Sequence, residues 1–175
     1  MTGRKFSMIS PELWRSARYH GLSDKAKVAH HYFLTNAHVT SPGCYILPDG
    51  YAASDLRWDL QTYQAMREEV QKAGLIDFDH EHSVIFIEKW LKHNAPKNQK
   101  HAIGMYKFIN EIPSDRLRQK TLDVLAPIEK ARVAKYGRDD AESEGRDAKT
   151  ELDSRSAFGS DSHLTKTAFM RGQRR

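Results

Sequence analysis

The first part of the chain contains segments in which hydrophobic side chains recur at helical spacing. Ser10 followed by Pro11 is typical of a helix start, so the segment from Pro11 to His20 is expected to form a helix that ends at Gly21. A second helix is expected after the capping residue Ser23. It is predicted to be long and to face the core, because apolar residues return every three or four positions: Leu22, Ala26, Ala29 and Phe33.

Residues 59–89 carry the most informative pattern in the chain. Asp59 is a helix cap, and Gly74 fits a left-handed helix stop. Between them, apolar residues advance by three or four positions: Leu60, Tyr63, Met66, Val70 and Ala73. The segment from Leu75 to Asp79 then alternates in the manner of a strand, and Ser83 to Ile87 returns as a second strand after a polar turn. The pattern predicts a helix followed by a short hairpin.

Two shorter segments precede this helix. Gly50 to Leu56 can form a short helix, and Cys44 to Leu47 is long enough only for a strand or extended link, which can pair with the later hairpin. Two helices followed by a hairpin are the arrangement of a winged helix-turn-helix, in which the second helix reads DNA and the hairpin is the wing. The predicted fold class is therefore α+β, mainly α, with residues 4–95 as a winged helix-turn-helix domain.

The expected reading helix has one apolar side and one polar side. Tyr63, Met66 and Val70 cluster on the side that faces the core, whereas the outward side includes Glu68, which would repel phosphate. Glutamine, threonine and small side chains near a helix N-terminus can contact base edges in the major groove. We expect base readout from Gln61, Thr62, Gln64 and Ala65.

Basic residues flank the expected reading helix. Residues 89–101 contain four lysines and no acidic residue, which favours contact with a phosphate backbone. The tip of the expected wing is formed by His80, Glu81 and His82. The predicted phosphate contacts are Arg57, Arg67, Lys72, Lys89, Lys92, Lys97 and Lys100.

The part of the chain after the expected wing divides into helices and a polar tail. Residues 98–110 are expected to be helical, with Ile103, Tyr106 and either Ile109 or Phe108 on one side, and Ser114 is expected to cap a further helix. The apolar side of that further helix contains Leu117, Thr121, Val124, Leu125 and Ile128. Residues 98–136 are therefore predicted to be a C-terminal helical extension that docks on the core or on another subunit. Residues 137–175 are predicted to be a disordered tail.

Composition limits the class of protein. The 175 residues are 39% hydrophobic and carry a net charge of +5, all of it within residues 1–137, where 20 Lys and Arg face 15 Asp and Glu. No apolar run approaches the roughly 20 residues that cross a bilayer, and residues 1–5 lack a signal-peptide apolar region, so a cytoplasmic protein without membrane contact is expected. The single cysteine, Cys44, suits a reducing compartment and is expected to be a small, partly buried hydrophobe.

The sequence offers no catalytic or metal-binding constellation. It contains no glycine-rich dinucleotide or phosphate loop and no nucleophile-elbow motif, so neither enzymatic activity nor a cofactor is expected. His80 and His82 flank a hairpin tip, but further metal ligands at suitable spacing are missing. A protein that acts by binding is the better expectation.

About two thirds of the chain, residues 4–117, resembles the winged-helix domain of phage and prophage replication proteins of the replisome-organiser or replication-initiator type. The resemblance implies a phage-type protein in the bacterial cytoplasm that binds double-stranded origin DNA through residues 61–72 and the wing at 80–83. It also implies recruitment of a replicative helicase or helicase loader through a C-terminal part, although this tail is shorter than in longer members. The resemblance depends on these segments: Trp14-Arg-Ser, Leu22-Ser-Asp-Lys-Ala-Lys, Gly43-Cys-Tyr-Ile-Leu-Pro, Asp55-Leu-Arg-Trp, Glu69-Val-Gln-Lys-Ala-Gly-Leu-Ile-Asp-Phe-Asp and Trp90-Leu-Lys-His-Asn-Ala-Pro-Lys-Asn.

Two alternatives share the same expected fold. A winged-helix transcriptional regulator would form a homodimer through residues 98–136 and recognise a palindrome, whereas an initiator would occupy repeated sites. A protein-interaction module without DNA binding would use the winged helix and the tail to dock a partner.

Overall fold

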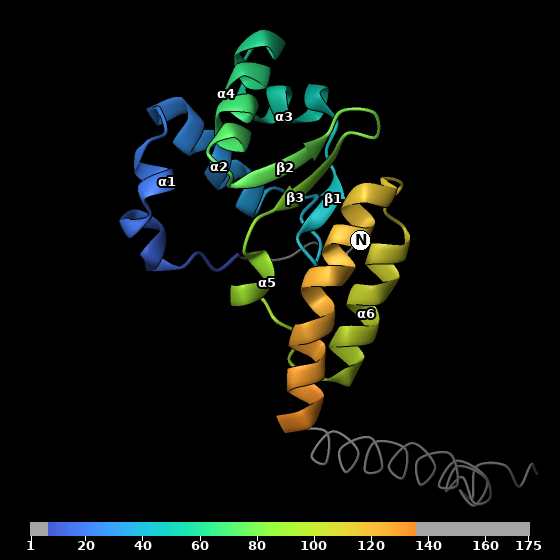
Figure 1. Cartoon of the computed structure of the whole chain (residues 1–175). Coiled ribbons are helices and arrows are strands. Elements are labelled where there is room, and N and C mark those ends of the chain that lie inside the picture. The colour runs from blue at the N-terminus through green and yellow to red at the C-terminus, as the bar shows by residue number, and fades with distance from the viewer. Residues whose placement is uncertain (1–6, 136–175) are drawn as a thin grey trace, which may run out of the picture. The chain divides into compact units, whose positions relative to one another are not determined.

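The computed structural model of the chain describes residues 7–135 and is mainly helical, with one three-stranded antiparallel sheet (Figure 1). The predicted class, α+β and mainly α, is confirmed at this level. One compact unit ends at Ala131, and the following description concerns this unit together with residues 132–135 at the end of the last helix. The predicted disordered tail, residues 137–175, lies outside the described residues.

The N-terminal segment begins with two short helices instead of the single helix expected over residues 11–20. The 3-10 helix η1 (Pro11–Arg15) ends at Ser16, whose extended backbone, with φ −77° and ψ 119°, separates it from α1 (Ala17–His20). The predicted cap is confirmed, because the Ser10 hydroxyl accepts a hydrogen bond from the Glu12 amide. The extended residue Ser16 thus divides a segment that helical spacing alone predicted to be one continuous helix.

Helix α2 (Asp24–Thr35) begins at the predicted cap and provides much of the core. The Ser23 hydroxyl accepts from the Ala26 amide, and the helix buries Ala26, Ala29, His30 and Phe33. A carboxylate from a distant helix strengthens this start, since Glu69 accepts hydrogen bonds from the Ser23 amide at 2.6 Å and from its hydroxyl at 2.8 Å. The start of α2 is therefore tied to residue 69.

The sheet has the strand order β1-β3-β2, with β1 (Cys44–Ile46), β2 (Ile76–Asp79) and β3 (Val84–Ile87). The expected pairing of the first strand with the hairpin is confirmed, because Cys44 lies opposite Phe86. Cys44 is buried, as expected of a small hydrophobe, and its burial raises the pKa of the thiol to about 11. The central strand β3 is buried at every residue, as befits a strand covered on both faces.

Helices α3 (Asp49–Leu56) and α4 (Leu60–Lys72) lie between β1 and β2 in the chain, as expected. The carboxylate of Asp59 accepts hydrogen bonds from the Thr62 amide at 2.8 Å and the Thr62 hydroxyl at 2.7 Å, so the predicted α4 cap is confirmed. Gly74 has φ +67°, the left-handed conformation expected after the helix. Local sequence signals therefore set both ends of α4.

The chain after β3 forms α5 (Trp90–His93), which the sequence did not predict, then α6 (Gln99–Asn110) and a helix over residues 115–135. The predicted cap Ser114 is confirmed, since its hydroxyl accepts a hydrogen bond from the Leu117 amide. Asn98, expected to lie within the helix, is instead the cap of α6 and accepts from the His101 amide. The predicted inner face of α6 is wrong in part. Ala102, Met105 and Ile109 are buried, whereas Ile103 and Phe108 are 47% and 44% exposed.

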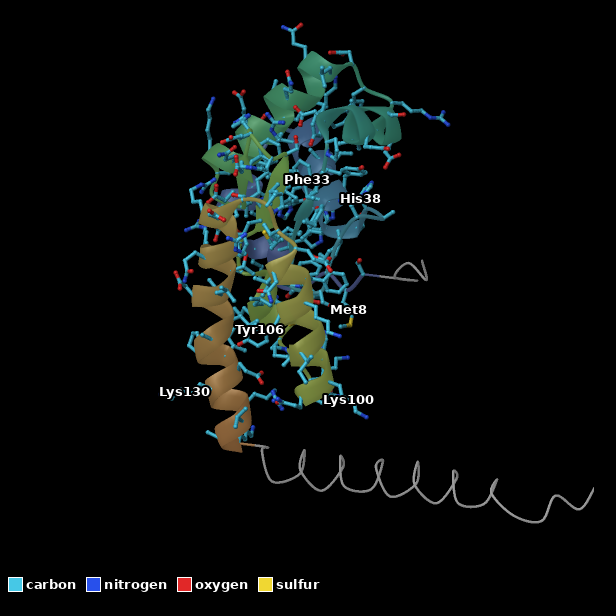
Figure 2. The ribbon with its side chains drawn as sticks, turned by 90° about the vertical axis from the view of Figure 1, so that its right-hand side faces the viewer. Met8, Phe33, His38, Lys100, Tyr106 and Lys130 are labelled. Atoms are coloured by element: carbon cyan, nitrogen blue, oxygen red, sulfur yellow. The ribbon has the colours of Figure 1, made fainter. Side chains whose placement is uncertain are left out.

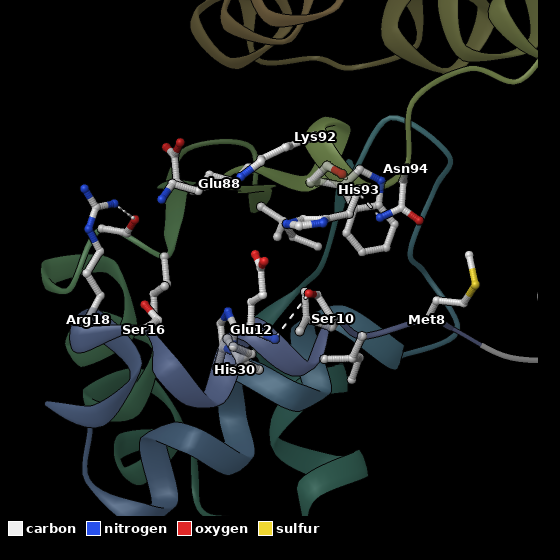
Figure 3. Close-up of a pocket in the computed structure, with 18 residues that line it drawn as sticks. Met8, Ser10, Glu12, Ser16, Arg18, His30, Glu88, Lys92, His93 and Asn94 are labelled. Carbon is white, nitrogen blue, oxygen red and sulfur yellow. Dashed lines mark hydrogen bonds between the residues drawn. The ribbon is translucent and has the colours of Figure 1, made fainter.

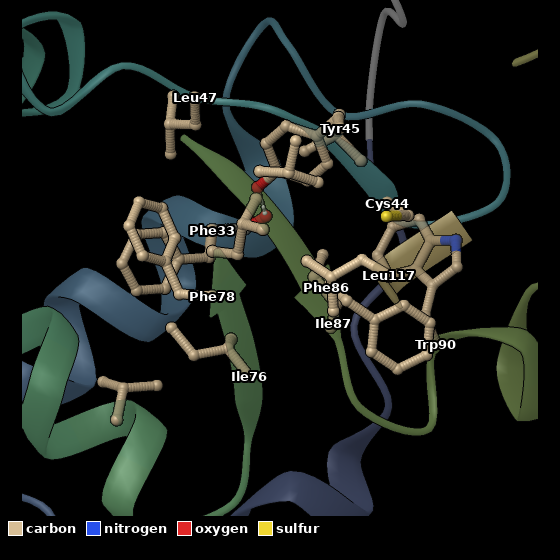
Figure 4. Packing of buried hydrophobic residues seen from close by; sticks show 14 of the residues in the cluster. Phe33, Cys44, Tyr45, Leu47, Ile76, Phe78, Phe86, Ile87, Trp90 and Leu117 are labelled. Atoms are coloured by element: carbon tan, nitrogen blue, oxygen red, sulfur yellow. Dashed lines mark hydrogen bonds between the residues drawn. The ribbon is translucent and has the colours of Figure 1, made fainter. Parts of the chain in front are cut away.

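Both C-terminal helices contribute to the same hydrophobic core as the sheet. Met105, Ile109, Leu117 and Leu125 belong to one cluster with Phe86, and Figure 4 shows Leu117 near Trp90 and Cys44. The core therefore extends past the boundary expected at residue 95. Of the two docking modes considered for these helices, packing on the core is the one observed.

Charged side chains also fasten the last helix to the hairpin. Arg116 donates to both carboxylate oxygens of Asp77 at 2.8 and 3.0 Å. Lys120 bridges Asp77 at 2.8 Å and Glu88 at 2.6 Å. These partners favour the ionised form of Asp77 and hold the pKa of its carboxyl below the usual range, although burial opposes them.

Candidate nucleic-acid interface

The outward face of α4 is exposed, but its charge is partly neutralised from within. Gln61, Ala65, Glu68 and Lys72 are exposed, as predicted. The Lys72 ammonium lies 3.8 Å from the Glu68 carboxylate, one turn away. Lys72 is therefore available to a phosphate only in competition with Glu68.

Two of the expected contact residues on α4 turn inward. Arg67 is 2% exposed, its guanidinium pairs with Asp49, and its Cζ lies 4.0 Å from the centre of the Phe78 ring. The Gln64 amide donates to the same carboxylate at 3.0 Å. Arg67 was predicted to contact phosphate, which requires an exposed side chain, but the aromatic ring and Asp49 together draw it into the core. Arg67 joins α4 to α3 and to the sheet instead.

Thr62 lies in the first turn of α4, the expected reading helix, and Arg57 lies just before this helix. The Thr62 hydroxyl donates to Asp59, so this side chain stabilises the helix start. The hydrogen bonds from Thr62 to Asp59 hold the pKa of that carboxyl below its ordinary value. Arg57 is exposed and adopts a left-handed backbone, φ 55°, in the turn between α3 and α4. Of the predicted basic residues around α4, Arg57 is the one whose side chain faces solvent without a described carboxylate partner.

The charge of the α3–α4 unit opposes contact with a polyanion. Residues 48–74 contain five acidic residues and three basic residues, a net charge of −2, and one of the three basic residues is the buried Arg67. Phosphate contact requires local positive potential. Such potential has to come from elsewhere in the fold.

A basic segment, residues 89–110, supplies that charge. It contains five lysines and no acidic residue, and all five lysines are exposed: Lys89, Lys92, Lys97, Lys100 and Lys107. Four of them are the predicted phosphate contacts of the flank. The segment includes all of α5 and α6, and three of the five lysines, Lys92, Lys100 and Lys107, lie in these helices.

A tryptophan fixes the start of the basic segment. Trp90 is 5% exposed, and its indole nitrogen donates to the Ser41 carbonyl at 2.8 Å. Gly43 allows the ring to approach, since a Cβ there would lie 2.3 Å from the Trp90 ring, and Gly43 itself has φ +72°. The residue before the tryptophan, Lys89, has φ 59°, and this turn directs the chain from β3 into α5.

The two halves of the predicted interface lie apart. In Figure 1, α4 occupies the upper part of the view, whereas α5 and α6 lie lower. In Figure 2, turned about the vertical axis, Lys100 lies at the lower end of α6. The structure therefore does not bring the expected base-reading residues Gln61, Thr62, Gln64 and Ala65 together with Lys97 and Lys100.

The predicted wing tip is a tight turn. His80 and Glu81 are exposed, while His82 is half-buried with its Nδ1 3.2 Å from Asp79. Ser83 has φ 52°, which closes the turn. Hydrogen bonds from Ser114, His82 and the Glu81 amide lower the pKa of Asp79 to about 2. A short, internally bonded tip offers little reach for DNA contact beyond His80 and Glu81.

Residues 7–135 contain neither a cluster of metal ligands nor a membrane-spanning helix. No group of three or more histidine, cysteine, aspartate or glutamate side chains is placed to hold a metal ion. No helix there is both long and apolar enough to cross a membrane.

Comparison with known proteins provides no independent assignment. No protein-family model matches the chain, and no curated protein or solved structure is significantly similar to it.

Proposed function

We propose that the segment from α2 to β3 is a winged helix-turn-helix and that the protein binds double-stranded DNA. The support from the fold is the element order α2, β1, α3, α4, β2, β3 with strand order β1-β3-β2. In such a domain the second helix and the hairpin flank the DNA. The observation that carries the proposal is the basic segment, with five exposed lysines and no carboxylate.

The proposed mechanism requires no chemistry from the protein. Lys89, Lys92, Lys97 and Lys100 neutralise phosphates and release counterions, which gives affinity without sequence preference. Gln61 and Ala65, exposed on α4, are the candidates for base contact, and each good bidentate contact contributes about 1–3 kcal/mol of discrimination. Because these groups lie apart, we propose that the duplex follows a path from α4 toward α5 or that separate duplexes occupy the two surfaces.

The biological role that we propose is DNA replication initiation in a phage or prophage, with a replicative helicase or its loader as a further partner. The resemblance of residues 4–117 to replication proteins supports this role. Selection of bound fragments from the source genome tests it, because a cluster at an origin supports initiation and a cluster at promoters supports the transcriptional regulator.

Salt-dependent binding to a duplex tests the DNA contact itself. Replacing Lys92, Lys97 and Lys100 by glutamine should reduce the slope of log affinity against log salt by about 2.7, or about 0.9 for each lost phosphate contact. The matched control replaces Lys25, Lys27 and Lys130 by glutamine. These lysines lie outside the basic segment, so the slope of log affinity against log salt should change little. An unchanged slope in the first variant would remove the basic segment from the interface.

The protein-interaction module stays a second candidate because of one specific observation. The α3–α4 unit carries a net charge of −2, and its Arg67 and Gln64 contact Asp49. That surface is better suited to a basic protein partner than to a phosphate backbone. If no duplex is bound even at low salt, this candidate replaces the DNA-binding proposal.

A further inference from the structure

A cavity of about 180 Å³ lies between the N-terminal segment and the junction of β3 with α5 (Figure 3). Its walls are largely apolar, and they include Leu13 of η1, Leu34 of α2, Ile87 of β3 and Trp90 of α5. Apolar walls with a few convergent polar groups are the usual composition of a small-molecule site. The cavity lies away from the outward face of α4, so it is distinct from the expected reading surface.

A buried histidine, His30, is among the residues that line this cavity. His30 is 4% exposed, and its Nδ1 atom has no hydrogen-bond partner among the described residues. Burial, with a smaller contribution from His31, lowers the pKa of His30 to about 4, so the ring is neutral at pH 7. The Nδ1 atom itself is buried, so His30 adds a neutral ring to the wall of the cavity and no hydrogen-bonding group.

A carboxylate points into the cavity above the histidine. Figure 3 shows the Glu12 side chain directed from η1 toward the space below Glu88 and Lys92, and no described residue pairs with its carboxylate. The second carboxylate at the cavity, Glu88, is already bound by Lys120 at 2.6 Å. Glu12 is therefore the acceptor that is available to a ligand.

Cations surround the opening of the same cavity. Arg18, Lys89 and Lys92 line it, and the Arg18 guanidinium is held by a hydrogen bond to the Gly74 carbonyl at 3.1 Å. Lys89 and Lys92 are exposed. An anionic group at the opening would be attracted by all three charges.

We infer that this cavity binds one nucleotide unit, with the base between the apolar walls and the phosphate at Arg18, Lys89 and Lys92. A nucleobase has apolar faces that suit Leu13, Ile87 and Trp90. Its edge carries amino or imino donors for the exposed carboxylate of Glu12, and its phosphate would lie near the three cations.

The same chemistry is available from two sources, a free nucleotide or an unpaired nucleotide of a DNA strand. Lys89 and Lys92 belong to both the cavity and the basic segment, so a strand held by that segment could place a base here. The inference does not depend on duplex binding. A protein that binds no duplex can still bind a nucleotide at this site, and the reverse also holds.

Titration calorimetry of the full chain with each of the four deoxynucleoside 5′-monophosphates tests the inference, with inorganic phosphate as the probe for the opening alone. At least one nucleotide should bind at least tenfold more tightly than phosphate. Glu12→Gln and Lys92→Gln should each weaken that nucleotide at least tenfold. The matched controls Glu111→Gln and Lys130→Gln, in exposed positions away from the cavity, should bind as the parent does.

His30→Leu provides a test at the cavity wall, and its circular dichroism spectrum and melting temperature show whether it folds. Chemical shifts of the Trp90 indole on titration give a second readout that does not depend on any variant. The inference is overturned if no nucleotide binds, if phosphate binds as tightly as every nucleotide, or if the Glu12 and Lys92 variants bind as the parent does. A hairpin oligonucleotide with one unpaired nucleotide, compared with a fully paired one, distinguishes the two sources: tighter binding of the former identifies a strand, and equal binding identifies the free nucleotide.

Discussion

Helix α4 and the basic segment, residues 89–110, show opposite uses of polar side chains. On α4, Arg67 and Gln64 both contact Asp49, and Lys72 lies beside Glu68. In the basic segment five lysines extend into solvent, with no carboxylate in the same segment. Helix α4 is the helix expected to read DNA in a winged helix-turn-helix, but its polar side chains largely stabilise the fold. In this molecule the helix that was expected to read DNA and the exposed positive charge therefore lie in different segments.

The largest loss of stability should come from Gly43→Ala, which changes the contact that holds Trp90 at the start of the basic segment. The new Cβ would lie 2.3 Å from the Trp90 ring, and alanine would have to adopt φ +72°. Overpacking and backbone strain together should lower the free energy of unfolding by about 4 kcal/mol. Denaturant unfolding measures this change.

Gly50→Ala is the matched control for that substitution. Gly50 lies in α3, and no atom lies within 4 Å of a Cβ built there. Alanine should raise the stability by about 0.5–1 kcal/mol, because it reduces the freedom of the unfolded chain. Equal effects of the two alanines would contradict the proposed close fit between residue 43 and Trp90.

Arg67→Met should cause the next largest loss of stability. It tests whether Arg67 on α4 stabilises the fold or contacts DNA. Methionine keeps an apolar stem against Phe78 but leaves Asp49, whose side chain is 23% exposed, without its cationic partner. We expect a loss of about 3 kcal/mol in thermal or denaturant unfolding. The control Lys72→Met removes an exposed charge and should change stability by less than about 0.5 kcal/mol. If Arg67→Met retained full stability and lost only DNA affinity, Arg67 would be a contact residue after all.

Sequence preference offers a third way to test the comparison. In a binding-site selection, Gln61→Ala should relax the preference by about 1–2 kcal/mol at the affected base pair, because Gln61 is exposed on α4. Gln64→Ala should act less strongly on preference, since the Gln64 amide donates to Asp49. A double variant with undiminished preference would show that α4 does not read bases and would leave the basic segment as the DNA contact.

The smallest effect concerns the hairpin tip and its dependence on pH. The folded state lowers the pKa of Asp79 to about 2, so this carboxylate stabilises the fold above its unfolded pKa near 3.9, and that stability is lost as the pH falls through 2. The hydrogen bonds lie near solvent, so we expect a contribution of about 1 kcal/mol. Asp79→Asn should be less stable at pH 6 and should show a shallower loss between pH 5 and pH 2. Parallel stability curves for the variant and the parent would contradict this role.

Local signals made the ends of helices predictable. Ser10, Ser23, Asp59 and Ser114 all cap as predicted, because a cap depends only on a side chain and the next three amides. The hairpin also follows from the local alternation of apolar residues, whereas its pairing with β1 joins Cys44 to Phe86, which are far apart in sequence. The split near Ser16 and the unpredicted α5 depend on packing against segments far along the chain.

The candidate site was less predictable because the direction of a polar side chain depends on hydrogen-bonding and charged residues that are distant in sequence. The sequence predicts Arg67 as a phosphate contact, but Asp49 and Phe78, distant in sequence, draw it inward. The cavity was missed for the same reason. Nothing in the order of residues signals that Glu12, His30 and Lys92 line one cavity. Both adjacent histidines contact the Tyr19 ring, but the Tyr19 hydroxyl is hydrogen-bonded to His31, whereas the Nδ1 atom of His30 has no described partner.

The helix that begins at residue 115 has a consequence for the order in which the molecule is made. Its Leu117 and Leu125 complete a core to which Phe33 and Phe86 belong, and its Arg116 and Lys120 bind the hairpin. Synthesis proceeds from the N-terminus, so the sheet is made before this helix. One apolar side of the sheet therefore stays uncovered until the helix has left the ribosome. A nascent chain halted near residue 95 would therefore present that side to chaperones, and release from them would coincide with emergence of the last helix.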